Sequence, residues 1–170
     1  MDEGENRPTG GLFRLQPNLA CHKMIDGIIC SNALCSSPDS RVTYHADSGR
    51  RTVPGMGFDP ATGNIDKRRV FVRIATADGV PDGATVDSEG FVWIPLGRLA
   101  HRPLRSRRSR RPDDHAAGCA ACPMFGGPCL DIIFVISASI SARRRARRSR
   151  RPAFAIKGGV KRLPEARFRG

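Results

Sequence analysis

The sequence is poor in aromatic residues and has no long apolar segment. It contains one Trp and one Tyr among 170 residues, and its longest apolar run, residues 130–136, is interrupted by Asp131. A membrane-spanning helix needs about 20 apolar residues, so we expect no membrane partner. The N-terminal stretch MDEGENRPTGG lacks the basic and apolar regions of a secretory signal. We therefore expect a cytoplasmic protein whose six cysteines are reduced thiols.

Helical periodicity is also missing, because no segment repeats apolar residues at a spacing of 3.6 over three turns. Short apolar segments instead alternate with turns rich in Gly, Pro, Asp and Ser, which predicts an all-β fold. Residues 83–86 and 91–94 form an expected hairpin around the turn 87–90. The β-branched segment 130–136 predicts a buried strand. Other expected strands are 11–15, 41–46 with Val42 and Tyr44 on one face, and 69–74 with Val70, Val72 and Ile74 on one face.

A weak internal repeat runs through the chain. The strings SPDSRVTY at 37–44, DSEGFVW at 87–93 and GGPCLDIIFV at 126–135 each place a polar turn before a strand with an aromatic residue. The units recur every few tens of residues, which is compatible with propeller blades of about 40–50 residues. Any all-β protein contains such units, so the repeat alone leaves the architecture open.

The strong positive charge comes from two short runs. The net charge is +13, yet residues 98–111 and 143–151 hold seven Arg each and no acid, and the remaining 15 cations face 16 anions. The rest of the chain is therefore nearly neutral.

Two alternatives involve the runs and the cysteines. Clustered Arg side chains can neutralise phosphates, so an arginine-rich nucleic-acid-binding protein is the alternative function. Neither run is interleaved with aromatics or lies in a nucleic-acid-reading motif, and we expect no specific nucleic-acid partner. For the alternative function, the candidate nucleic-acid contacts are Arg107, Arg108, Arg110, Arg111, Arg144, Arg145, Arg147 and Arg148.

The histidines and cysteines offer a further alternative. His115, Cys119, Cys122 and Cys129 could form a zinc site, although coincidence explains the spacing more simply. His45 lies on an expected strand and is interpreted as structural.

Several exact strings resemble one family. SNAL at 31–34, SPDSR at 37–41, YHADS at 44–48, FDPATGNI at 58–65, RRVF at 68–71, PDG at 81–83 and VDSEGFVW at 86–93 follow one another at natural spacing. MFGGP at 124–128, FAI at 154–156 and LPEARFRG at 163–170 continue the series. The ordered set resembles the gluconolactonase family, which includes regucalcin (senescence marker protein) and luciferin-regenerating enzyme.

The resemblance implies a six-bladed β-propeller with one divalent metal on its axis, calcium above all, with zinc or manganese as options. It implies that Asn32 and Asp82 bind the metal and that Asp82 is the catalytic base. Glu3 and Glu5 are candidates for substrate contact. Amide and carboxylate oxygens are ligands that Ca²⁺ prefers. Gly83 would let the backbone turn sharply after Asp82.

The chemistry implied is metal-dependent hydrolysis of a sugar lactone. A cation polarises the lactone carbonyl, and a carboxylate takes a proton from the attacking water. The resemblance places a further metal-binding Glu upstream of the sequence. We therefore expect one truncated domain over residues 1–170, roughly the C-terminal two-thirds of a propeller, with little activity of its own.

Residues 94–121 and 141–153 depart from the family strings. Both segments are rich in Arg, Ala, Pro and Ser, and the family strings resume after each with little change in length. We interpret the two segments as shifted reading frames that are disordered or do not fit the fold, with genuine inserts as the alternative. The coding DNA of residues 94–121, translated in the other two frames, tests this hypothesis. The particular lactone, the metal and the oligomeric state stay open.

Overall fold

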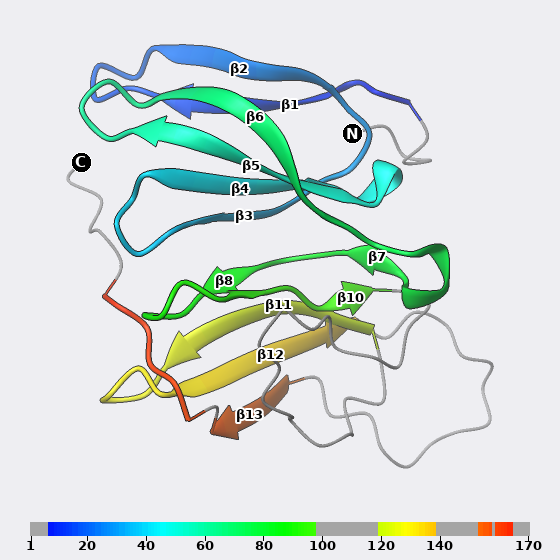
Figure 1. The fold of residues 1–170 in the computed structure, drawn as a ribbon, viewed down its shortest axis with the longest axis vertical. Helices are drawn as coiled ribbons and strands as arrows, with labels where there is room; N and C mark the ends of the chain where they lie inside the picture. Colours follow the sequence, from blue (N-terminus) through cyan, green and yellow to red (C-terminus); the bar gives the residue numbers. More distant parts are fainter. Residues whose placement is uncertain (1–6, 98–118, 139–152, 158, 165–170) are drawn as a thin grey trace.

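The computed structural model describes residues 7–97, 119–138, 153–157 and 159–164 (Figure 1). Strands make up nearly all of its regular structure, and the helical elements in these ranges are the two short 3₁₀ turns η1 (Ser48–Arg50) and η2 (Thr76–Asp78). The all-β prediction is confirmed. No helix among the described residues has the length and apolar character to cross a bilayer.

One complete four-stranded sheet follows the chain without crossovers. Its strands lie in the order β3-β4-β5-β6, and each pair is antiparallel. The connections are tight turns, which fits the Pro, Asp, Ser and Gly residues between the strands. The strands are β3 (Ser31–Ser36), β4 (Val42–Asp47), β5 (Thr52–Asp59) and β6 (Asn64–Arg73).

The next unit is one long hairpin built from four short strands. The outer strands β7 (Val80–Pro81) and β10 (Leu96–Gly97) pair with each other, as do the inner strands β8 (Thr85–Val86) and β9 (Val92–Trp93). Asp87 organises the turn, because its carboxylate accepts the backbone N–H groups of Glu89 and Phe91 and the indole N–H of Trp93. The predicted hairpin is confirmed.

The sheets stack along the long axis of the molecule (Figure 1). The hairpin of β1 (Gly10–Leu15) and β2 (Cys21–Ile28) lies at one end, and the sheet β11-β12-β13 lies at the other. Between them, β8 contacts β3 on one side and β11 on the other. The described strands form an open stack, and closure into six blades stays a prediction. The last sheet consists of β11 (Cys119–Gly126), β12 (Ile132–Ala138) and β13 (Ala153–Lys157).

The internal repeat corresponds to one structural position. The three repeated strings span the turns between β3 and β4, between β8 and β9, and between β11 and β12. Each string therefore turns the chain from the first strand of a unit into the second. Of these first strands, β8 contacts both β3 and β11.

Burial along the strands differs from the simple alternation expected from the sequence. In β4, Tyr44 is buried with Val42 packed against the same core cluster, and Thr43, His45 and Asp47 are also buried. Both faces of β4, an interior strand of its sheet, are therefore buried.

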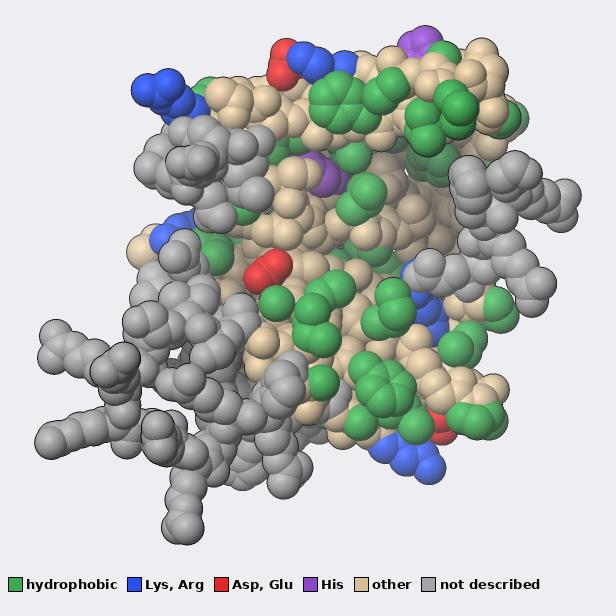
Figure 2. Space-filling model, turned by 180° about the vertical axis from the view of Figure 1, so that it is seen from behind, with side chains coloured by type: hydrophobic (Ala, Val, Ile, Leu, Met, Phe, Trp, Pro, Cys, Tyr) green, Lys and Arg blue, Asp and Glu red, His purple; other side chains and the backbone are tan. Residues whose placement is uncertain are grey.

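The prediction of a buried strand over 130–136 needs correction, and the expected strand 69–74 is not buried throughout. Val70 is 48% exposed, since β6 is the edge strand of its sheet among the described residues. The segment predicted as a buried strand, 130–136, is buried on one face only: Ile133 and Val135 point into the core, whereas Phe134 and Ile136 are exposed. On the face seen in Figure 2, hydrophobic side chains gather over the lower part of the molecule, where β11–β13 lie.

Regular structure extends into both segments that depart from the family strings. Within 94–121, Ile94 and Leu96 are buried in the main core, and β11 begins at Cys119. Within 141–153, Ala153 begins β13, which pairs with β12. Residues 98–118 and 139–152 lie outside the described residues, so the predictions of disorder and shifted frames are not tested there.

Candidate metal and substrate site

Asn32 and Asp82 stand on neighbouring units of the stack. Asn32 is the second residue of β3, and Asp82 directly follows β7. Both residues are half-buried. The β3 strand contacts β8, and η1 contacts β7, so the two candidate positions lie on elements that pack against each other.

Ser48 links the two positions. The Asn32 amide Nδ2 donates to Ser48 Oγ at 2.9 Å, and the Ser48 hydroxyl donates to the Pro81 carbonyl oxygen. Pro81 is the residue before Asp82. The buried hydroxyl therefore connects the side chain of one candidate ligand to the backbone of the other. Sequence reasoning assigned Ser48 no role, although Ser48 ends the string YHADS that carries the resemblance.

Hydrogen bonds fix the orientation of the Asn32 side-chain amide. Because Nδ2 of Asn32 is held by Ser48, and more weakly by Cys30 Sγ at 3.6 Å, the amide has a defined orientation. Among the described residues no hydrogen bond reaches its Oδ1. The Asp82 carboxylate lies next to Gly97, with Oδ2 3.4 Å from the point that a Cβ there would occupy. The two side chains that the resemblance assigns to a cation thus carry an amide oxygen and a carboxylate, which are ligand types that Ca²⁺ prefers.

Gly83 has a different role from the one expected. Its φ angle is not positive, so the predicted sharp glycine turn is wrong. The Gly83 N–H instead donates to the Ala121 carbonyl oxygen at 2.7 Å. A Cβ at this position would lie 2.9 Å from that oxygen and from Cys122 Cα. Gly83 therefore allows β11 to approach the backbone beside Asp82.

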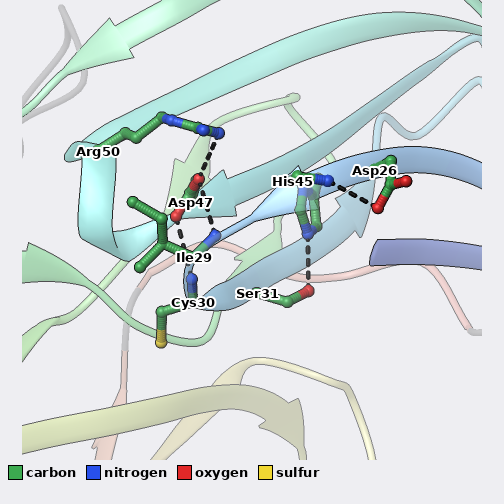
Figure 3. A network of polar contacts seen from close by, with 8 residues as sticks. Asp26, Ile29, Cys30, Ser31, His45, Asp47 and Arg50 are labelled. Atoms are coloured by element: carbon green, nitrogen blue, oxygen red, sulfur yellow. Dashed lines mark hydrogen bonds and ion pairs between the residues drawn. The ribbon is translucent and has the colours of Figure 1, made fainter. Parts of the chain in front are cut away.

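A buried carboxylate fixes the strand that carries Asn32 (Figure 3). Asp47 accepts the backbone N–H groups of Ile29 at 3.3 Å and Cys30 at 3.1 Å, and it pairs with Arg50 at 2.9 Å. Ile29 and Cys30 form the connection from β2 into β3. Asp47 thereby holds the chain immediately before Ser31 and Asn32.

His45 is buried and occupied by a structural contact, as interpreted from the sequence. Its Nε2 lies 2.8 Å from Ser31 Oγ (Figure 3). Burial lowers the pKa of His45, and the positive charge of Arg68 lowers it further, while Asp47 opposes the shift. The ring is therefore neutral at neutral pH.

The remaining candidates are not tested by the structure. Glu3, Glu5, His115 and the eight arginines named as nucleic-acid contacts lie outside the described residues. Cys122 and Cys129 are described and exposed. Within the described ranges, no cluster of three or more His, Cys, Asp or Glu side chains could hold a metal.

The chain matches the model of one protein family. The model of the SMP-30/Gluconolactonase/LRE-like region matches residues 1–139. The chain belongs to this family. Regucalcin of Danio rerio is 29% identical over 178 residues, an alignment that covers 100% of this chain and 60% of that relative.

Solved structures of the family share the fold. A luciferin-regenerating enzyme superposes with a TM-score of 0.71 and 25% identity, covering 91% of this chain and 54% of that one. A structure described as a calcium-binding protein, regucalcin, from Agrobacterium tumefaciens superposes with a TM-score of 0.73 and 22% identity, covering 85% and 50%. The chain spans about half of the length of the relatives it matches.

Proposed function

We propose that the chain is a sugar-lactone hydrolase of the gluconolactonase type, with a divalent cation, calcium first, at Asn32 and Asp82. The observation that carries the proposal is the Asn32–Ser48–Pro81 linkage, which ties the two residues implied by the family resemblance into one region. Family membership supports the reaction class. The calcium-binding description of the Agrobacterium relative supports the metal.

Each residue has a distinct part in the proposed reaction. A bound divalent cation would polarise the lactone carbonyl. Asn32 would hold the cation through its amide oxygen, and the hydrogen bond to Ser48 keeps the amide from rotating. The Asp82 carboxylate would hold the same cation and would accept the proton of the attacking water. Gly97 and Gly83 leave room for this carboxylate and for β11 beside it.

We expect weak metal binding and slow hydrolysis from this chain. Ca²⁺ takes about six to eight oxygen ligands. The two assigned side-chain donors supply only part of this number, so other oxygens or water would have to complete the coordination. Each missing protein ligand lowers the affinity and leaves the lactone less firmly positioned.

Isothermal titration with CaCl₂ tests the metal site separately from catalysis. We expect binding that weakens at least about tenfold in both Asp82→Asn and Asn32→Ala. Glu89→Gln is the matched control, because it removes an exposed carboxylate from the turn of the same hairpin. Equal calcium affinity in Asp82→Asn and Glu89→Gln would contradict the metal assignment.

Hydrolysis of D-glucono-δ-lactone, followed by proton release, tests the reaction. We expect a slow calcium-dependent rate that Asp82→Asn abolishes and Glu89→Gln leaves intact. A rate that persists in Asp82→Asn would remove Asp82 as the base. Calcium binding without a rate above the spontaneous one would leave a metal-binding protein and refute the hydrolase.

A further inference from the structure

The outer strand of the four-stranded sheet carries a groove lined with arginine. The groove has a volume of about 380 Å³ and lies between β5 and β6. Among the described residues, none that lines it is acidic. Its lining comprises Arg50, Arg68, Arg69, Arg73, Thr52, Pro54 and Val70.

A second groove continues the first along β6. It has a volume of about 500 Å³ and shares Arg69 and Val70 with the arginine groove. It adds the cations Arg41 and Lys67 and the aromatic ring of Phe71. Phe71 is 49% exposed, although it packs at 4.8 Å between ring centroids against the buried Tyr44. About half of the Phe71 side chain thus lies exposed in the groove that also holds Arg41 and Lys67.

The two grooves together form a basic band along β6, and few acidic residues offset its positive charge. Asp66 is the acidic residue that lines the second groove, and it lies 3.7 Å from Lys67. Arg50 is paired with Asp47, whereas no ion pair within the described ranges involves Arg68, Arg69 or Arg73. The field of Arg68 reaches into the sheet, where it disfavours the charged form of His45.

The dimensions favour a polymeric ligand over a small anion. Residues 66–73 are extended, and a strand rises about 3.3 Å per residue, so the band is roughly 23 Å long. Charged side chains on an edge strand also discourage pairing with other sheets. Protection of the edge strand does not require an exposed aromatic ring. Proteins that bind single-stranded nucleic acid, in contrast, combine a basic groove with aromatic rings on which the bases stack.

We propose that β6 is a sequence-tolerant binding surface for single-stranded nucleic acid. Arg68, Arg69 and Arg73 contact the phosphates, and Phe71 stacks with a base. This surface is built from other residues than the Asn32–Asp82 region and the arginine-rich runs 98–111 and 143–151.

Fluorescence anisotropy with labelled eight-nucleotide rU and dT strands tests this proposal on the full chain. The test variant replaces Arg68, Arg69 and Arg73 by Gln. Its matched control replaces Arg107, Arg108 and Arg110 by Gln, which removes the same charge from the first arginine run. We expect the test variant to lose at least about tenfold more affinity than the control. Its plot of log affinity against log salt should be less steep by about 2, since each lost single-strand phosphate contact contributes about 0.7.

Phe71→Leu separates stacking from charge. We expect about tenfold weaker binding with an unchanged salt slope, because stacking of one base is worth about 1–3 kcal/mol. Tighter binding of rU assigns the surface to RNA, and tighter binding of dT assigns it to DNA.

Three results would overturn the proposal. The first is equal loss in the two triple variants, which would mean that net charge alone drives binding. The second is full affinity in Phe71→Leu. The third is displacement of the oligonucleotide by inorganic pyrophosphate at matched ionic strength, which would make the groove a small-anion site. Circular dichroism of each variant confirms that the sheet is retained.

Discussion

The sheets β3–β6 and β11–β13 begin with the same strand-turn-strand plan but bury their second strands differently. In the first sheet, β4 is buried on both faces, and it places His45 and Asp47 inside the protein with hydrogen-bond partners. In the second sheet, β12 is buried on one face and exposes Phe134 and Ile136 on the other. The first sheet belongs to a large core cluster, whereas the second has a small one of its own.

The difference teaches that local sequence plan and burial are separate properties. Both second strands have high β propensity and follow a polar turn. What differs is the number of neighbouring units, since β4 lies inside a stack and β12 lies in the last sheet of the described residues (Figure 1). The polar groups in β4 are tolerated because each finds a partner, and such a buried network then determines where neighbouring strands lie.

The sharpest test of this contrast removes matched apolar groups from the two cores. Ile74 is buried in the large cluster and Ile133 in the small one. We expect Ile74→Ala to lower the free energy of unfolding by about 3–4 kcal/mol and Ile133→Ala by about 2 kcal/mol, because the small core can relax around the cavity. Ile136→Ala, on the exposed face, should cost less than about 0.5 kcal/mol. Urea denaturation measures all three, and an Ile133→Ala cost equal to that of Ile74→Ala would break the comparison.

The second-largest loss of stability is expected when the buried polar network of the first sheet is disrupted. Asp47→Ala leaves the N–H groups of Ile29 and Cys30 without their acceptor, so we expect a loss of about 2–4 kcal/mol of stability. Asp66→Ala is the control, because its carboxylate forms an exposed pair with Lys67 that is worth about 0–1 kcal/mol. Thermal unfolding followed by circular dichroism gives both values. Similar values for the two variants would show that burial of Asp47 has no energetic consequence.

The contact between the hairpin and the last sheet can be tested at one glycine. In Gly83→Ala the new methyl group meets Ala121 and Cys122 backbone atoms at 2.9 Å, so we expect a loss of about 1–3 kcal/mol. Gly55→Ala serves as the control, because its Cβ would meet Tyr44 at an ordinary distance of 3.5 Å. Calcium titration of Gly83→Ala should also show weaker binding, since the strand beside Asp82 must shift. Equal stability of both variants would contradict the close approach.

The smallest expected effect is a pH dependence of stability due to His45. Its pKa is lowered in the folded protein by burial and by Arg68, so the unfolded chain binds more protons between the two pKa values. The contribution of His45 to stability is complete above its unfolded pKa of about 6.5 and is lost as the pH falls through the window below it. Urea midpoints between pH 7.5 and 5 should fall less in His45→Gln than in the wild type. A His22→Gln control, at an exposed position, should retain the wild-type decline.

Sequence reasoning succeeded where the determinants are local. Asp87 and Gly90 are a turn signal that needs no distant partner, and the hairpin forms where the string DSEGFVW places it. It failed where burial or close packing depends on residues that are distant in the sequence. The segment 130–136 has the β-branched composition of a buried strand but exposes Phe134 and Ile136, and Gly83 matters because β11 passes next to it rather than because the chain turns.

For the candidate site, the positions were predictable and the linkage was not. Asn32 and Asp82 follow from the resemblance to the family, residue by residue. Ser48 could have been suspected from its place in the string YHADS, yet nothing in the sequence indicates that its hydroxyl reaches the Pro81 carbonyl, 33 residues away along the chain. The basic groove on β6 likewise depends on which side chains of β5 and β6 lie together.

The sequence by itself determined the all-β character, the order of the turns and the family, because propensity, turn chemistry and exact strings are properties of short segments. Only the tertiary structure decided which strands are buried on both faces, which polar groups are satisfied and which arginines share a groove. The physical reason is that burial and electrostatic fields depend on the neighbours of a residue in space. Those neighbours are determined by how segments distant in the sequence pack together.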